Sequence, residues 1–264
     1  AELKQIDRLL ERRFLAGRIN GFDPEFGGAI PPPAGLHPLF RMYLGVVNKC
    51  RGDLIPVGNL TAAVEPDAAA EIALDFKAQG FTAQKWFFRY GPGDGEEGMA
   101  KNVALAYALR EAVGPYYPLM FDAFMGWNVR YASHMVQHLA LLNVTWVEEA
   151  LPPERVGGFR RIKNAANVPL ATGEHVYTRW QTKELLVNEA IDFLQNDPDW
   201  TGGITELFKL GALASSFEVP IIAHGHSLMA ALHVAGAQSP AVVPYIDFAA
   251  TNLLDVLTAA SQEL

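Results

Sequence analysis

The sequence predicts an α/β protein whose main part is a (β/α)8-type, TIM-like barrel. From residue 53 onward, short runs of apolar, β-branched and aromatic residues alternate with longer segments of helical periodicity. The short runs number eight. Strand–helix alternation indicates parallel strands joined by right-handed crossovers, and a count of eight favours a closed barrel over an open doubly wound sheet.

The eight runs are interpreted as the strands of the barrel, in chain order. They are LIPVGNL (54–60), FTAQKWFF (81–88), YPLMFDAF (117–124), VTWVEEA (144–150), VPLATGE (168–174), IDFLQND (191–197), VPIIAHG (219–225) and AVVPYIDF (241–248). The predicted helices between them begin at proline or acidic residues and end at glycine or asparagine, as helix termini prefer. Examples are PDAAAEIALDFKAQG (66–80), EEGMAKNVALAYALREAVG (96–114) and GGITELFKLGALASS (202–216).

Residues 1–52 do not follow this alternation. A basic amphipathic helix (3–17) is followed by a Gly/Pro-rich stretch (20–35) and a second helical piece (36–49). We interpret residues 1–52 as a partial N-terminal capping segment and residues 53–264 as the barrel. A helical decoration on the outside of the barrel is the alternative interpretation of the first segment.

The composition excludes several classes of protein. The net charge of −8 and the pI near 5.4 argue against a nucleic acid or an anionic membrane as partner, because both require clustered Lys and Arg. The single cysteine, Cys50, excludes an internal disulfide framework, and no apolar run reaches the roughly 18 residues of a membrane span. We therefore expect a soluble protein of a reducing compartment, the cytoplasm.

Acidic residues recur at the carboxyl ends of the predicted strands, where barrels of this class carry their functional groups. Asp122, Glu148 and Glu174 end strands three, four and five, and each is separated from the next by 26 positions. One strand–helix unit therefore brings each carboxylate to the same height on the next strand. Three converging carboxylates repel one another unless a cation lies between them, and oxygen ligands with open positions for water or substrate favour Mg²⁺. The alternative for any one of these acids is a helix cap or a solvated loop residue.

A histidine and an aspartate end two neighbouring strands at matching heights. His224 ends strand seven and Asp197 ends strand six. An aspartate beside a histidine fixes its tautomer and raises its basicity, which is how an acid/base pair is assembled. The alternative is a histidine satisfied by a backbone carbonyl. His175, directly after Glu174, and His226 are candidate substrate contacts.

Successive strand side chains face opposite sides, so Glu148 and its neighbour Glu149 are expected to differ in role. We expect Glu149 to point away from the metal ion, or toward the cations of strand two, and to support the site without binding the ion. On strand two, Lys85, Phe87 and Arg89 share one face. If that face is the lumen, Lys85 becomes a candidate acid/base and Arg89 a candidate contact for an anionic substrate. An ion pair with Glu149 is the structural alternative.

Gly93, Gly95 and Gly98 match the G-x-G-x-x-G spacing of dinucleotide sites. The residues between them include acids, which place negative charge where a pyrophosphate would bind. We interpret this stretch as a glycine-rich lid or turn over the barrel mouth.

Together these pieces resemble the enolase superfamily, in particular its mandelate racemase subgroup and the L-rhamnonate dehydratase-like acid-sugar dehydratases. The matching motifs are LMFDAFMGWN (119–128), WVEEALPPE (146–154), TGEH (172–175), LQNDPDWTGGITE (194–206), IAHGHS (222–227) and PYIDF (244–248). The resemblance implies a modified (β/α)7β barrel whose mouth is closed by an N-terminal α+β capping domain. The resemblance runs from about residue 38 to residue 248.

The resemblance also implies the roles of individual residues. Mg²⁺ would be bound by the three carboxylates described above, and the His224–Asp197 pair would act as general acid and base. Asp247, at the end of strand eight, and Trp200 would contact the substrate. The implied partner is a small acid sugar, with no nucleic acid or membrane, and we expect a homo-oligomer.

The implied reaction is Mg²⁺-dependent dehydration of an aldonate or aldarate. Abstraction of the α-proton gives a metal-stabilised enediolate, and loss of the 3-hydroxyl then gives a 2-keto-3-deoxy acid. One alternative is a racemase or epimerase of a 2-hydroxy acid, which needs bases on both faces of the substrate. Another is a non-catalytic member that binds sugar acids.

The sequence departs from the family pattern in three places. Phe87 stands where many relatives carry a second lysine, which argues against two-base racemisation. Phe124 stands where many carry an asparagine, so one polar substrate contact is missing or supplied elsewhere. The β-meander expected before residue 1 and most of the tail expected after strand eight are lacking, which predicts a divergent short form or an incompletely represented chain.

Overall fold

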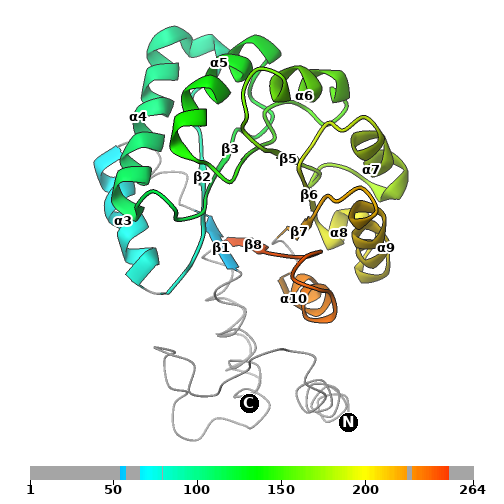
Figure 1. Cartoon of the computed structure of the whole chain (residues 1–264). Helices are drawn as coiled ribbons and strands as arrows, with labels where there is room; N and C mark the ends of the chain where they lie inside the picture. Colours follow the sequence, from blue (N-terminus) through cyan, green and yellow to red (C-terminus); the bar gives the residue numbers. More distant parts are fainter. Residues whose placement is uncertain (1–53, 58–65, 79, 225–227, 250–264) are drawn as a thin grey trace, which may run out of the picture.

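A closed barrel of eight parallel strands, surrounded by helices, forms the core of the protein (Figure 1). The computed structural model describes residues 54–57, 66–78, 80–224 and 228–249. The strands follow one another around the barrel in chain order, and β1 closes it against β8, with Leu54 opposite Ile246. The predicted fold class is therefore confirmed. The segment 1–52 and His226 lie outside the described residues.

The strands are short, with three or four residues each. They are β1 (Leu54–Val57), β2 (Gln84–Phe87), β3 (Leu119–Asp122), β4 (Trp146–Glu148), β5 (Leu170–Thr172), β6 (Phe193–Asn196), β7 (Ile221–Ala223) and β8 (Ile246–Ala249). All eight are present at the predicted places, but the paired backbone covers only part of each apolar run. Residues just past the strands therefore belong to the loops of the barrel mouth.

Helices follow the strands along the chain and, apart from the four-residue α8 (Pro198–Thr201), cover the outside of the barrel (Figure 1). They are α3 (Pro66–Ala78), α4 (Gly95–Val113), α5 (Val129–Leu139), α6 (Val156–Lys163), α7 (Thr178–Val187), α8 (Pro198–Thr201), α9 (Ile204–Ser215) and α10 (Leu228–Ala237). The three helices given as examples above are α3, α4 and α9, and their ends lie within two residues of the predicted ones. None of the helices in the described part of the chain is long and apolar enough to span a membrane.

Two apolar layers hold the barrel together. The larger lies between the strands and the helices, and includes the outward-facing side chains of Trp86, Phe121 and Val147. A smaller cluster, which we call the apolar plug, takes one side chain from on or next to each of the strands β2 to β8. Its members are Ala83, Met120, Trp146, Ala171, Phe193, Ile222 and Tyr245. Because strand side chains alternate, residues two positions further along these strands face the same lumen, nearer its carboxyl end.

The strand register brings the predicted acidic residues onto neighbouring strands. Asp122 lies directly opposite Glu148 in the β3–β4 ladder, as their spacing predicts. Glu148 is opposite Ala171 in the β4–β5 ladder, so Glu174 lies three residues beyond that level. Equal spacing in the sequence therefore gives matching register only for the first pair, and the loop after β5 has to bring Glu174 to the site.

Arg110 fastens the opposite end of the barrel, from the last turn of α4. Its guanidinium donates hydrogen bonds of 2.6 to 3.0 Å to the carbonyl oxygens of Leu142, Gly114, Tyr117 and Asn143. These carbonyls belong to the segments that lead into β3 and β4. Arg110 therefore joins α4 to the starts of two strands whose other ends carry acidic residues of the site.

Replacing Arg110 with methionine is expected to lower the free energy of unfolding by about 2–4 kcal/mol, because several carbonyl groups lose a charged donor. Urea unfolding followed by circular dichroism measures this change. Arg161→Met, on the exposed face of α6, is the matched control and should leave the free energy of unfolding nearly unchanged. Similar losses in both variants would contradict the role given to Arg110.

Candidate active site

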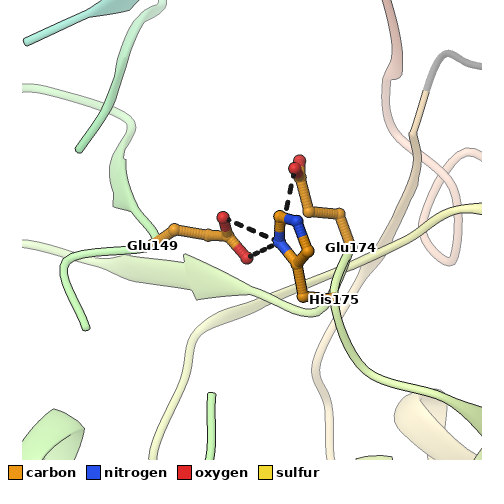
Figure 2. A group of neighbouring side chains, drawn as sticks. All are labelled: Glu149, Glu174 and His175. Carbon is orange, nitrogen blue, oxygen red and sulfur yellow. Dashed lines mark hydrogen bonds and ion pairs between the residues drawn. The ribbon is translucent and has the colours of Figure 1, made fainter. Parts of the chain in front are cut away.

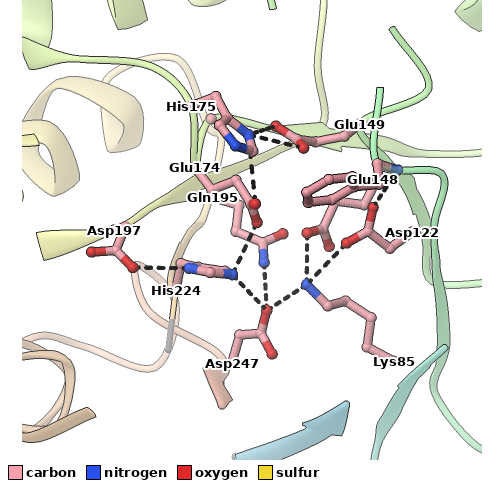
Figure 3. A network of polar contacts seen from close by, with 12 residues as sticks. Lys85, Asp122, Glu148, Glu149, Glu174, His175, Gln195, Asp197, His224 and Asp247 are labelled. Atoms are coloured by element: carbon pink, nitrogen blue, oxygen red, sulfur yellow. Dashed lines mark hydrogen bonds and ion pairs between the residues drawn. The ribbon is translucent and has the colours of Figure 1, made fainter. Parts of the chain in front are cut away.

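Polar side chains lie above the apolar plug, at the carboxyl end of the lumen. Lys85, Asp122, Glu148, Gln195 and Asp247 each follow a member of the plug by two positions, and each is at most 1% exposed. Alternate residues of a strand face the same side, so these five side chains point into the lumen together. Figure 3 shows that they converge in one network of polar contacts.

Asp122, Glu148 and Glu174 form a group that could hold a metal ion. One oxygen from each lies within 4.8 Å of the others, so the structure brings the three predicted ligands together. A second group, Glu149, Glu174 and His175, meets the same distance limit and shares Glu174 with the first. The first group offers only oxygen atoms, which suits Mg²⁺, whereas the second includes a ring nitrogen.

Gly173 allows Glu174 to reach this group. Its φ of 138° is one that residues with a side chain rarely adopt, and a Cβ here would lie 2.6 Å from the carbonyl oxygen of Gln195. The side-chain amide of Asn196 donates a hydrogen bond of 2.7 Å to the Gly173 carbonyl. This close packing against β6 directs Glu174 into the mouth, although β5 itself ends at Thr172.

Glu149 does not follow the alternation of β4. The strand ends at Glu148, and Glu149 has a φ of 42°, in the left-handed region that is uncommon for a non-glycine residue. With this conformation its buried carboxylate faces His175, whose Nδ1 lies 2.8 and 3.1 Å from the two carboxylate oxygens (Figure 2). Lys85 pairs with Glu148, so the ion pair considered for strand two is made with the other glutamate.

Lys85 is the cation of the buried network. Its Nζ donates hydrogen bonds to Asp247 Oδ2 at 2.5 Å and to Glu148 Oε1 at 2.6 Å, and lies 3.7 Å from Asp122 Oδ2. Burial lowers the pKa of Lys85, but the surrounding carboxylates, Asp247 first, outweigh this effect and raise the pKa well above its ordinary value. Lys85 is therefore a fixed positive charge near neutral pH.

The carboxyl groups of the site differ in their affinity for protons. Burial raises the pKa of Asp122 to about 7 and that of Glu148 well above its ordinary value. Burial, with the charges of Glu174 and Glu148, raises the pKa of Glu149 to about 9. Burial opposes the charge of Glu174 as well, but the hydrogen bond from His224 outweighs it and lowers the pKa of Glu174 to about 2. Among these four acids, Glu174 therefore holds its negative charge most firmly.

His224 and Asp197 form the predicted pair. Nδ1 of His224 lies 2.9 Å from Asp197 Oδ2, and Nε2 lies 2.9 Å from Glu174 Oε2. Burial lowers the pKa of His224, but the hydrogen bonds to Asp197 and Glu174 raise it to about 10. Asp197 also caps α8, since its Oδ1 accepts a hydrogen bond of 2.7 Å from the backbone N–H of Asp199. The paired carboxylate and the helix cap are thus the same residue.

Aromatic rings border the mouth beside His175. Trp200 lies edge to face with His175, with ring centres 5.1 Å apart, and Tyr177 stacks on Trp200 at 6.1 Å. Phe124, which replaces the asparagine of the family pattern, lies 5.9 Å from His175 and is largely exposed. The mouth therefore combines apolar rings with the acidic group.

Arg89 is exposed, and its guanidinium lies 5.8 Å from the ring centre of Tyr90. Within the described residues no ion pair joins Arg89 to the acids of the site. The G-x-G-x-x-G stretch forms a turn into α4, in which the Asp94 carboxylate accepts a hydrogen bond of 2.8 Å from the backbone N–H of Gly91. A carboxylate thus occupies the helix start where a pyrophosphate would bind.

Gln195 was not predicted from the sequence. It is fully buried, and its Nε2 donates a hydrogen bond of 2.6 Å to Asp247 Oδ2. The available signal was its position two residues before Asp197, on the face of β6 that points into the lumen. An uncharged amide at a strand end is a weaker signal than a carboxylate, because amides are buried with less cost.

A closed parallel barrel with a carboxylate cluster at the carboxyl ends of its strands defines a TIM-barrel protein with a site of the metal-binding type. Residues 67–261 match the family model described as enolase C-terminal domain-like. The chain belongs to this family, which confirms the resemblance that the motifs indicated.

Individual relatives agree with this assignment. The chain is 36% identical, over 165 residues, to an L-rhamnonate dehydratase of Saccharopolyspora erythraea, a match that covers 62% of this chain and 40% of that protein. The structure is similar to rhamnonate dehydratase from Gibberella zeae complexed with Mg, with a TM-score of 0.65, 28% identity and coverage of 95% of this chain and 60% of that one. It is also similar to a racemase from Streptomyces coelicolor A3(2) with bound magnesium, with a TM-score of 0.63, 27% identity and coverage of 75% and 52%. The chain thus spans between 40% and 60% of the length of these relatives.

Lys85→Met is expected to lower the free energy of unfolding of the metal-free protein by about 3–5 kcal/mol, because Glu148 and Asp247 lose their buried cation. The loss should shrink as the pH is lowered, since protonated carboxyl groups no longer need a cation. Urea unfolding in EDTA measures both effects. Lys101→Met is the matched control, because Lys101 pairs with Glu97 at 2.7 Å on the exposed surface and its loss should matter little. If both variants unfolded alike, the buried network would not have the importance assigned to it.

Proposed function

We propose that this chain forms the barrel of a Mg²⁺-dependent hydro-lyase that dehydrates an acid sugar, an aldonate or aldarate. The observation that carries the proposal is the 2.9 Å contact between His224 Nε2 and Glu174 Oε2, which brings an Asp197-paired histidine to the edge of a three-carboxylate group. A dehydratase of this kind needs a cation that acidifies the α-hydrogen and a group beside it that moves protons. The similarity to L-rhamnonate dehydratases supports the same reaction class.

The donor set fits Mg²⁺. Asp122, Glu148 and Glu174 offer only oxygen atoms, and each is at most 7% exposed. The single charge of Lys85 is shared among several buried carboxylates, so a divalent cation would balance charge that the protein itself leaves uncompensated. When bound there, Mg²⁺ would supply the positive charge that stabilises an enediolate.

His224 is proposed as the general acid and base. Asp197 holds Nδ1, so Nε2 is the atom that exchanges protons. Burial lowers the pKa of His224, but in the metal-free protein the hydrogen bonds to Asp197 and Glu174 raise it to about 10, so Nε2 carries a proton near neutral pH. With a cation held by the Glu174 carboxylate, His224 would lose the second of these contacts, release that proton and be able to act as the base. His224 Nε2 would take the α-proton of the acid and return a proton to the 3-hydroxyl, which leaves as water, and tautomerisation of the resulting enol gives a 2-keto-3-deoxy acid. Asp247, His175 and Trp200 border the same space and are proposed to contact the substrate.

Racemisation of a 2-hydroxy acid receives less support from the geometry. It requires a second base on the opposite face of the substrate. Lys85 is held by Asp247 and Glu148, and its pKa lies well above its ordinary value, so it is a poor base near neutral pH. Phe87, at the position of the second lysine in many relatives, cannot accept a proton.

A library of aldonic and aldaric acids, incubated with the protein and Mg²⁺ and assayed for 2-keto products, tests the proposal. We expect the wild-type protein to convert at least one acid, and His224→Asn to reduce kcat/KM at least about 100-fold. Deuterium exchange at the α-carbon without loss of water would instead indicate racemisation or epimerisation. Mg²⁺ binding without turnover of any acid would indicate a non-catalytic sugar-acid-binding member.

Mg²⁺ should stabilise the protein more strongly at higher pH. Burial raises the pKa of the Asp122 carboxyl from its ordinary 3.8 to about 7 in the metal-free protein. Because this pKa is higher in the folded than in the unfolded chain, protonation of Asp122 stabilises the metal-free fold. The stabilisation is complete below the pKa of the unfolded chain, about 4, and is lost as the pH rises through about 7. Mg²⁺ binds the ionised carboxylate, so its affinity grows over the same window. Differential scanning fluorimetry should show a larger Mg²⁺-induced rise in Tm near pH 8 than near pH 6.

Two glutamine variants identify which carboxylate group holds the ion. Glu148 belongs to the oxygen-only group, whereas Glu149 belongs to the group that includes His175. Glu148→Gln is expected to abolish the Mg²⁺-induced rise in Tm, and Glu149→Gln to retain most of it. The reverse order would place the ion in the second group, and a rise that did not change with pH would remove Asp122 from the ligand set.

A further inference from the structure

Gln195 lies in the centre of the polar network, on β6, two positions beyond Phe193 of the apolar plug. It is fully buried, and its Nε2 donates a hydrogen bond of 2.6 Å to Asp247 Oδ2. The opposite orientation of the amide would place its oxygen against a carboxylate oxygen at this distance. The contact with Asp247 therefore fixes which end of the amide faces the rest of the site.

The amide oxygen of Gln195 has no hydrogen-bond partner among the residues that the structure describes. In Figure 3 it points away from Asp247, toward the side of the network where Glu148 lies. A buried acceptor without a partner costs about 1–3 kcal/mol. Buried polar groups in native folds are nearly always paired, so this oxygen indicates a donor that enters the site with a ligand.

The charges of the network determine the chemistry of that donor. Gln195 Oε1 is only an acceptor, so it cannot pair with the ionised carboxylate of an acid sugar, which is also only an acceptor. The Lys85 ammonium is already engaged by Glu148 and Asp247. A neutral hydroxyl group fits, because it donates a hydrogen bond and brings no charge.

We propose that Gln195 is a specificity-determining residue whose Oε1 accepts a hydrogen bond from a hydroxyl group of a polyhydroxy acid. This inference rests on the function proposed above and narrows its substrate class. An acid without that hydroxyl leaves the buried acceptor unpaired, so the site favours sugar acids over 2-hydroxy acids with apolar tails. An ordered water is the other source of the same donor.

Calorimetric binding to the Mg²⁺-loaded protein tests the assignment. The probes are the aldonate that binds most tightly in the library screen and its monodeoxy analogues, each lacking one hydroxyl beyond C2. For the wild-type protein we expect one analogue to bind at least about tenfold more weakly than the parent. Gln195→Met, of similar volume but without the amide, should bind parent and analogue about equally. Undiminished discrimination in this variant would overturn the proposal.

Two further results separate the possible explanations. A crystal structure of the complex should show a ligand hydroxyl within hydrogen-bond reach of Gln195 Oε1, whereas a water retained there would overturn the proposal. Gln195→Met should keep the Mg²⁺-induced rise in Tm. Loss of that rise would show that the amide helps to hold the ion, and this would overturn the proposal. A wild-type protein that binds Mg²⁺ but no acid sugar would contradict the proposed function and this inference with it. A wild-type protein that binds an acid sugar but binds every monodeoxy analogue as tightly as the parent would contradict this inference alone.

Gln84→Met is the matched control. Gln84 is also a fully buried glutamine of the barrel, but both ends of its amide are paired within the fold. Its Nε2 donates to the Ala73 carbonyl at 2.8 Å, and its Oε1 accepts a hydrogen bond of 3.1 Å from Trp86 Nε1. This variant should lose stability and still distinguish the parent acid from its analogue. If Gln84→Met lost discrimination as Gln195→Met is expected to, the loss would reflect a general destabilisation of the barrel, and this would contradict the proposal.

Discussion

The ammonium group of Lys85, buried among carboxylates, is the interaction on which the rest of the site depends. It reaches from β2 to Glu148 on β4 and to Asp247 on β8, and so connects strands on both sides of the closure between β1 and β8. Asp247 Oδ2 also accepts a hydrogen bond from Gln195, which adds β6 to the same contact. One positive charge thus lets several buried carboxylates share the lumen, and it does so directly above the apolar plug.

The mouth of the barrel is shaped by unusual backbone conformations just after three consecutive strands. Phe124 and Met125 follow β3, Glu149 follows β4 and Gly173 follows β5, and all four have positive φ. Each non-glycine case costs of order 1 kcal/mol and persists where neighbouring contacts hold it. Here the Met125 N–H donates to the Glu149 carbonyl at 2.6 Å, and the Glu149 N–H donates to the Ala171 carbonyl at 3.0 Å. The strained turns therefore support one another and bring side chains to the mouth that a regular strand would turn away.

The change from regular strand to positive-φ turn at the barrel mouth explains which residues could be predicted from the sequence. The eight strands and the lumen-facing positions of Asp122 and Glu148 follow from two-residue alternation, which holds inside the sheet. The direction of Glu149 could not be predicted, because alternation ends where φ becomes positive. Glu174 was predicted at the mouth from its place at the end of the fifth apolar run, 26 positions after Glu148, but its route there depends on the turn at Gly173. Alternation indicates that Gln195 faces the lumen, but it carries no charge and was therefore not singled out, and its hydrogen bond to Asp247 identifies it in the folded state. The chemical roles of these residues remain predictions.

A short segment from β6 into α8 holds several side chains of the site in place. Gln195 and Asp197 lie two residues apart, and so both face the lumen, one toward Asp247 and the other toward His224. Asp197 also caps α8, so the orientation of the carboxylate that holds His224 is coupled to the start of the helix that carries Trp200. Trp200 in turn packs against His175, whose Nδ1 is held by Glu149. Both histidines are therefore oriented by protein contacts before any ligand arrives, which is the condition under which fixed groups contribute most to a reaction.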